Sequence, residues 1–123
     1  MHSRHALSAA VMCLCLAPLV SSQDAVSTDP KHYTVITDNS QVRILKVHYG
    51  PHERSILHSH PATVAVFLTD ATARMILPDG KTQDTKVKAG ETQYSPATTH
   101  LPENAGEAGM DLIVIELKGD VKK

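Results

Sequence analysis

The stretch HSHPATVAVFL, residues 58–68, places two histidines at the mouth of an apolar segment. Its second half is rich in the β-branched and aromatic residues that favour strands. In a strand, residues i and i+2 point to the same face and lie roughly 6.5 Å apart. His58 and His60 would therefore share one space, where two imidazoles can bind a metal ion at about 2.0–2.1 Å from each nitrogen. No acidic residue lies within the stretch.

Short segments rich in Val, Ile, Thr and Tyr surround this stretch and are separated by turn residues. These segments cover residues 33–37, 41–49, 55–60, 63–69, 73–77, 81–87, 92–95 and 111–117. Residues 78–80 (PDG) and 89–91 (AGE) are typical of tight turns. No segment after residue 22 shows a sustained helical period. The pattern predicts an all-β sandwich or barrel over residues 31–119.

The first 22 residues have the three parts of a secretory signal peptide. Arg4, with His2 and His5, precedes an apolar run that ends at Val20, and Val20 and Ser22 fit the pattern of a cleavage site. We therefore expect a signal peptide at residues 1–22, a flexible leader at 23–30 and a periplasmic or secreted protein. After cleavage, no stable membrane span is expected.

Composition argues against several kinds of chemistry. Cys13 and Cys15 are the two cysteines of the chain, and both would leave with the signal peptide, so thiolate catalysis and disulfides are not expected. The chain has 12 Lys+Arg and 13 Asp+Glu, a net charge of −1, with no basic stripe. It has three tyrosines, one phenylalanine and no tryptophan. We therefore expect no nucleic-acid partner.

A second group of motif residues follows the apolar strands. Gly90, Pro96, His100 and Asn104 occur in the order G-x5-P-x3-H-x3-N. Together with Gly50 and the two earlier histidines, this order resembles the two signature motifs of the cupin superfamily, over roughly residues 40–117. The resemblance implies an RmlC-like jelly-roll barrel, or double-stranded β-helix. More narrowly, the chain is similar to small single-domain bacterial cupins, of which one branch is associated by name with β-alanine degradation.

The resemblance also implies that His58, His60 and His100 hold a divalent metal. Cupins usually carry a glutamate after the second histidine, whereas this chain has Val64 and Ala65 at the two candidate positions. We expect Val64 to take that place, with Ala65 as the alternative. Three neutral imidazoles favour Fe, Zn, Cu or Ni over Mn, and disfavour Mg. The alternative is a barrel whose histidines bind a small molecule without a metal.

The phase of the apolar strand predicts the walls of the pocket. If Val64 takes the glutamate position, Val66 and Leu68 share its face and line the barrel interior, and Tyr94 is a further candidate for the lining. The opposite face, with Ala65 and Phe67, would then be free to pack against a second copy. The resemblance implies a homodimer as the assembly.

Two classes of function are compatible with these residues. Within the family, iron sites of three histidines occur in dioxygenases, which implies a metal-dependent oxygenase or related enzyme acting on a small chelating or anionic compound. A zinc centre would instead act as a Lewis acid. The alternative is a cupin that binds or senses a small molecule without turnover, since the sequence supplies no nucleophile–base pair beside the histidines. No catalytic residue is predicted.

Overall fold

The structure, a computed structural model, describes residues 23–119. These residues form one short helix and nine strands. The helix is α1 (Ala25–Thr28), and the strands are β1 (Tyr33–Asp38), β2 (Val42–Tyr49), β3 (His58–His60), β4 (Thr63–Phe67), β5 (Ala71–Ile76), β6 (Thr82–Val87), β7 (Thr92–Ser95), β8 (Thr98–Asn104) and β9 (Met110–Leu117). The predicted all-β fold is confirmed.

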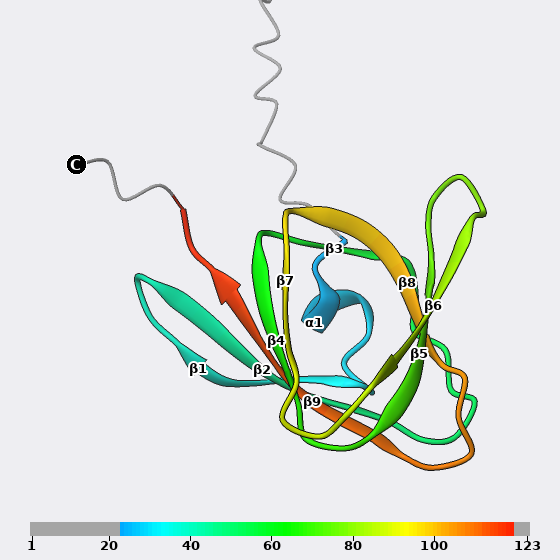
Figure 1. The fold of residues 1–123 in the computed structure, drawn as a ribbon. Helices are drawn as coiled ribbons and strands as arrows, with labels where there is room; N and C mark the ends of the chain where they lie inside the picture. Colours follow the sequence, from blue (N-terminus) through cyan, green and yellow to red (C-terminus); the bar gives the residue numbers. More distant parts are fainter. Residues whose placement is uncertain (1–22, 120–123) are drawn as a thin grey trace, which may run out of the picture.

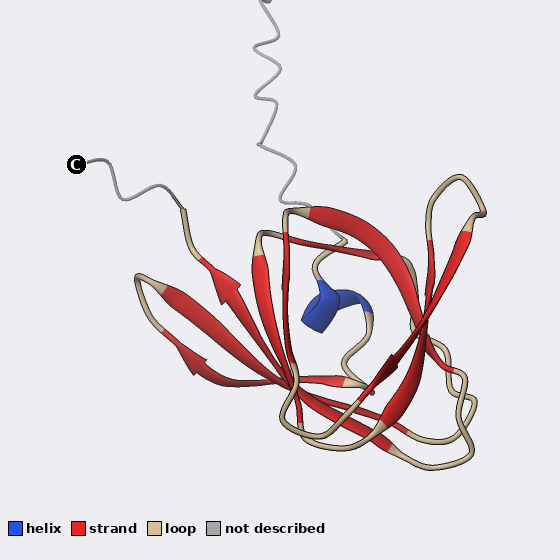
Figure 2. Ribbon diagram, viewed as in Figure 1, coloured by secondary structure: helices blue, strands red, loops and turns tan. Residues whose placement is uncertain are grey.

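The strands form two antiparallel sheets that face each other (Figures 1 and 2). The five-stranded sheet has the order β1-β2-β9-β4-β7, and the four-stranded sheet has the order β3-β8-β5-β6. The two predicted turns lie between β5 and β6 and between β6 and β7. There, Gly80 and Gly90 have φ angles of 85° and 89°, which glycine adopts without steric cost. The edge strands are β1 and β7 in the first sheet and β3 and β6 in the second. α1 contacts β1 and β3 at one edge of the barrel.

The hydrophobic core lies between the sheets and is centred on β2 and β9. Side chains of β9 alternate between buried and half-buried along the strand, as expected when one face packs on a core. Leu45 pairs with Val114, and Val47 pairs with Leu112, and all four side chains are buried. Glu116 follows the same inward phase of β9 and is only 2% exposed. A carboxylate thus lies on the inner face of β9, which is otherwise apolar.

Strand β8 differs from its prediction. No strand was predicted around His100, whereas seven residues, Thr98–Asn104, form a strand. Pro102 lies within it and has no backbone N–H to donate, while its carbonyl oxygen accepts a hydrogen bond from the Ser55 amide at 2.9 Å. β8 pairs with β3 on one side and with β5 on the other. This strand brings the second motif directly beside the first.

The segment that precedes β1 is docked on the barrel, although a flexible leader was predicted at residues 23–30. The Ser59 amide donates to the carbonyl oxygen of Gln23 at 2.6 Å, which covers the edge of β3. The side chain of Asp24 caps α1 by accepting from the Ser27 amide at 3.2 Å. Ala25 is fully buried, which the polar composition of the segment did not reveal. We call residues 23–32 the N-terminal segment.

The predicted signal peptide, residues 1–22, lies outside the described residues. Within residues 23–119, no helix has the length and the apolar character that crossing a membrane requires.

Candidate metal centre

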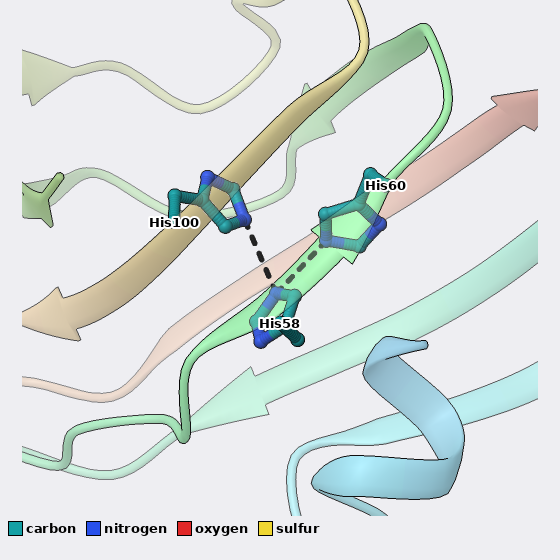
Figure 3. Close-up of side chains that lie close together, drawn as sticks. All are labelled: His58, His60 and His100. Atoms are coloured by element: carbon teal, nitrogen blue, oxygen red, sulfur yellow. Dashed lines mark hydrogen bonds between the residues drawn. The ribbon is translucent and has the colours of Figure 1, made fainter. Parts of the chain in front are cut away.

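Three histidines from two neighbouring strands converge inside the barrel (Figure 3). His58 and His60 come from β3, and His100 comes from β8, where it pairs with His58. The Nε2 atom of His58 lies 3.0 Å from Nε2 of His60 and 3.1 Å from Nε2 of His100. All three ligand atoms lie within 4.8 Å of one another. The structure therefore brings together the three residues that the sequence singled out, and we call them the histidine cluster.

Hydrogen bonds at the far ring nitrogen orient His58 and His60. His58 Nδ1 donates to the carbonyl oxygen of Ile56 at 2.7 Å, and His60 Nδ1 donates to a carboxylate oxygen of Glu116 at 2.8 Å. Because a carbonyl and a carboxylate can only accept, a proton is assigned to Nδ1 of each ring. The Nε2 atoms of the two rings then face each other at 3.0 Å. A cation bound between them would be held by both rings.

Burial keeps two of the three rings neutral. Burial lowers the pKa of His58 to about 4, although the hydrogen bond to the Ile56 carbonyl acts in the opposite direction. Burial, reinforced by the charges of His60 and His58, lowers the pKa of His100 to about 3. Both rings are therefore unprotonated at neutral pH, which is the state that ligates a metal.

The spacing of the cluster fits a transition metal. Two nitrogens bound to one ion at about 2.0–2.1 Å lie about 2.9 Å apart at a right angle and about 3.4 Å apart at a tetrahedral angle. The two closest pairs, at 3.0 and 3.1 Å, fall within this range. Neutral imidazoles suit Fe, Zn, Cu and Ni. The cluster could hold one divalent ion of this class.

A buried acid lies behind the histidine cluster, and it comes from the last strand rather than from the first motif. Glu116 of β9 accepts a hydrogen bond from His60 Nδ1, so its carboxylate acts on a histidine of the cluster from behind. Its other oxygen lies 3.7 Å from Nη1 of Arg43, which helps to stabilise the buried negative charge. A carboxylate in this position fixes the imidazole and increases its basicity as a ligand.

Glu116 was missed at the sequence level, although a signal for it exists. In the segment DLIVIEL, Glu116 occupies the i+2 and i+4 positions after Val114 and Leu112, two buried apolar residues of the strand. A charged residue in phase with the core must be paired. Its partner, His60, lies 56 residues away in sequence, and that distance hides the pairing.

The N-terminal segment adds further polar contacts behind the cluster. Asp29 accepts hydrogen bonds from His32 Nδ1 at 2.6 Å and from the Ser55 hydroxyl at 2.7 Å. The Ser55 oxygen lies 3.2 Å from Nδ1 of His58, where it can accept. All four residues are buried. Sequence reasoning assigned no role to His32, because the segment was taken to be flexible.

A second connection joins the N-terminal segment to His60. Asp24 and Arg43 form a two-pronged ion pair, with N···O distances of 2.8 and 3.3 Å. Because Arg43 also faces Glu116, the contacts run from Asp24 through Arg43 and Glu116 to His60. We call Asp24, Asp29, His32, Arg43 and Glu116 the charged network.

A cavity of about 330 Å³ opens toward the other edge of the barrel, between β4, β5, β6, β7 and β8. His100 and Thr98 of β8 belong to its lining, so the cavity adjoins the histidine cluster. Phe67 contributes to the apolar part of the wall, while Gln83 and Gln93 contribute amides. Apart from His100, no described residue of the lining is acidic or basic.

The four residues predicted to line the pocket lie elsewhere. None of Val64, Val66, Leu68 and Tyr94 belongs to the cavity lining. Leu68 is 50% exposed and Tyr94 is 67% exposed, and Tyr94 pairs with Val64 across the β4–β7 ladder. Gln93, the neighbour of Tyr94, lines the cavity in its place.

The phase of β4 explains this error. Thr63 and Phe67 are buried and Ala65 packs against the core, so the odd-numbered residues of β4 face inward. A shift of one residue moves every side chain to the other face. Position 65, rather than 64, therefore lies on the face where a cupin glutamate would be expected. Ala65 and Phe67 cannot form the outer face proposed for a homodimer, and the homodimer itself stays a prediction.

Comparison with solved structures supports one fold. A cupin domain from Bordetella pertussis is 22% identical, with a TM-score of 0.66, covering 71% of this chain and 92% of that one. An RmlC-like double-stranded β-helix protein from Methanocaldococcus jannaschii is 13% identical, with a TM-score of 0.56, covering 69% and 77%. A polyketide cyclase from Streptomyces resistomycificus is 15% identical, with a TM-score of 0.55, covering 69% and 63%.

No protein-family model and no curated protein sequence matches the chain. Identities this low carry an argument about fold only. The chain is therefore a small protein with the double-stranded β-helix fold of the cupin superfamily.

Proposed function

We propose that the protein binds one divalent transition metal through the Nε2 atoms of His58, His60 and His100, and that this centre takes a small-molecule ligand from the adjoining cavity. The observation that carries the proposal is the pair of Nε2 atoms at 3.0 Å in His58 and His60. Their far nitrogens donate to Ile56 and Glu116, so both Nε2 atoms point at the same space.

Each part of the site has a separate task. A bound metal of this class supplies Lewis acidity or, for a redox-active ion, electron transfer to a chelating compound. The three histidines leave coordination positions open, because the described chain offers no fourth ligand atom to the cluster. Glu116 holds the ring of His60, and the apolar wall of the cavity excludes water from the approaching compound.

We propose a metal-dependent oxygenase or related enzyme, acting on a small chelating or anionic compound. The support is the donor set of three histidines without a carboxylate, together with a described cavity lining that holds no carboxylate, lysine or tyrosine for proton transfer. The metal would then be the reactive centre. A protein of similar fold is named as a polyketide cyclase, so this architecture is compatible with catalysis on small organic compounds.

A second candidate is non-catalytic binding or sensing of a small molecule. The same lack of a proton-transfer group among the described lining residues favours it. Oxygen uptake separates the two candidates. The Fe²⁺-loaded enzyme should consume O2 when a chelating compound is added, whereas a binding protein should gain thermal stability with that compound and form no product.

Elemental analysis tests the metal itself. The protein is purified without a chelating affinity tag and measured by plasma mass spectrometry. We expect about one ion of Fe, Zn, Cu, Ni or Mn per chain. Protein that carries none, and takes up none from a panel of these ions, would contradict the proposal.

We also propose that residues 1–22 act as a signal peptide and that the protein is periplasmic or secreted. The support is the sequence pattern of a weakly positive start, an apolar run and a cleavage motif. The test is N-terminal sequencing of the protein recovered from the periplasm or medium of an expressing bacterium. Gln23 is the expected first residue, and an intact Met1 on cytoplasmic protein would contradict this proposal.

A further inference from the structure

The chemistry of the cavity wall defines what can enter it. The volume, about 330 Å³, lies near the lower end of the range of about 300–1,000 Å³ that is common for small-molecule sites. It corresponds to about eleven water molecules at about 30 Å³ each. A compound the size of one substituted ring fits such a space.

The deep part of the wall is apolar. Phe67, Ala73 and Val87 line it with exposures of 4%, 6% and 3%, and Met75 and Leu77 continue the apolar surface along β5. These side chains come from β4, β5 and β6 and would contact the body of a bound compound on several sides. Burial of apolar surface against them is the main source of affinity that this part of the site can offer.

The remaining wall is polar and uncharged. Gln83 and Thr85 come from β6, where they pair with Met75 and Ala73, and Gln93 comes from β7. Amide and hydroxyl groups can donate or accept, so they suit a carbonyl, an amide or a hydroxyl of a neutral compound. They cannot neutralise a charge.

Charge is therefore confined to one end of the site. His100 is the one described lining residue with an ionisable side chain, and it belongs to the histidine cluster. An ionised group placed deep in the cavity would lose its hydration without gaining a counter-ion, which is costly. A negative group is stabilised only at the histidine cluster, where a bound dication would face it.

We propose that the cavity selects compounds with a metal-chelating oxygen head, placed at the histidine cluster, and an uncharged, largely apolar body of about the size of one ring. This inference rests on the proposed metal site. It goes further by assigning the charge and the polarity of the two ends of the compound.

Hydroxamic acids provide the test, because the chelating head stays the same while the body changes. The Zn²⁺-loaded protein is titrated calorimetrically with acetohydroxamic acid, benzohydroxamic acid and 4-carboxybenzohydroxamic acid. We expect benzohydroxamic acid to bind about tenfold more tightly than acetohydroxamic acid, since its ring buries apolar area. The carboxylated ring should lose most of that gain. Equal affinity for the neutral and the carboxylated ring, or no gain from the ring, would overturn the inference.

An identical substitution at two positions of β6 provides a matched control. Thr85→Asp places a carboxylate in the cavity wall, whereas Thr82→Asp places it at an exposed position of the same strand outside the lining. The first variant should bind benzohydroxamic acid about tenfold more weakly, and the second should bind as wild type does. Equal binding by the two variants would contradict the assigned wall.

Zinc content measured on the same samples distinguishes a failure of the cavity inference from a failure of the proposed metal site. Protein that binds zinc but does not discriminate among the three hydroxamic acids overturns the cavity inference and leaves the metal site standing. Protein that binds no zinc or other panel metal overturns the proposed function and the inference together.

Discussion

The two sides of the histidine cluster differ in charge and in access. Toward β1, β3 and the N-terminal segment, the charged network of Asp24, Asp29, His32, Arg43 and Glu116 is largely buried and hydrogen-bonded. Toward β6 and β7, the cavity is open, and its described lining has no acid or base other than His100. Figure 1 shows α1 within the outline of the barrel.

This difference assigns the orientation of the rings to one side of the cluster and the choice of ligand to the other. The charged network orients the rings of His58 and His60 through their Nδ1 atoms and never reaches the cavity lining. In the proposed function the cavity selects the compound, and none of its lining residues contacts Nδ1 of His58 or His60. Substitutions behind the cluster should therefore change metal affinity, whereas substitutions in the cavity wall should change ligand choice.

The sharpest test of the charged side is Glu116→Gln. The substitution keeps the size of the side chain but removes the charge that faces His60 Nδ1, so metal affinity should fall about 10–100-fold. Competition with a fluorescent chelator measures the affinity, and circular dichroism verifies the fold. Glu107→Gln, at an exposed glutamate, is the control. Equal affinity in the two variants would show that Glu116 does not support the metal site.

A comparison of Ala65→Glu with Val64→Glu tests the phase of β4. Ala65 packs inward, so a glutamate there can offer a carboxylate to the metal and should tighten binding about tenfold. Val64 pairs with Tyr94 on the outer face, and its substitution should leave the affinity unchanged. The reverse order, with Val64→Glu tightening and Ala65→Glu without effect, would restore the phase first predicted from the sequence.

The pH dependence of stability tests how deeply the rings are buried. In the metal-free protein, the pKa values of His58 and His100 are about 4 and about 3, below the value of about 6.5 for an exposed histidine. The unfolded chain binds more protons in this window, so the free energy of unfolding should fall as the pH falls from about 6.5 toward 4.5. The slope is at most about 1.4 kcal/mol per pH unit for each ring.

Urea titrations across this window measure that slope. His100→Gln removes one of the two rings and should reduce the slope, whereas His48→Gln, at an exposed ring, should leave it nearly unchanged. If His100→Gln has the slope of wild type, the ring of His100 is not held neutral by burial.

The smallest effect is expected at Ser55. Its hydroxyl links Asp29 to His58, but His58 Nδ1 also donates to the Ile56 carbonyl, so the ring keeps one partner when the hydroxyl is removed. Ser55→Ala should weaken metal binding by about threefold or less. Ser59→Ala is the matched control and should match wild type, because its hydroxyl contacts Thr99 and Gln23 and no residue of the charged network. A loss from Ser55→Ala as large as that from Glu116→Gln would mean that the two connections are equally important.

Local sequence patterns were sufficient to predict part of the fold and of the site. The turns at Gly80 and Gly90 and the alternation in β9 follow from residues that are neighbours in sequence. The i, i+2 spacing of His58 and His60 places both rings on one face, because residues i and i+2 share a face in a strand of any register. His100 could be added from the second motif, although its strand, Thr98–Asn104, was not among the predicted segments.

The features that could not be predicted depend on the register between strands that are distant in sequence. The phase of β4 could not be carried across Pro61, because a proline and a bend separate it from β3. The pairing of His60 with Glu116 depends on β9 lying beside β4, where Thr63 pairs with Glu116. Docking of the N-terminal segment depends on an ion pair between Asp24 and Arg43 that no local pattern reveals.

The most direct test of the central claim is the metal content of the full-length protein beside its His58→Ala and His100→Ala variants, with His48→Ala as the control. The account predicts about one ion per chain in wild type and in the control, and close to none in the two cluster variants, all with a β-type circular dichroism spectrum. Full metal retention in either cluster variant would contradict the three-histidine site.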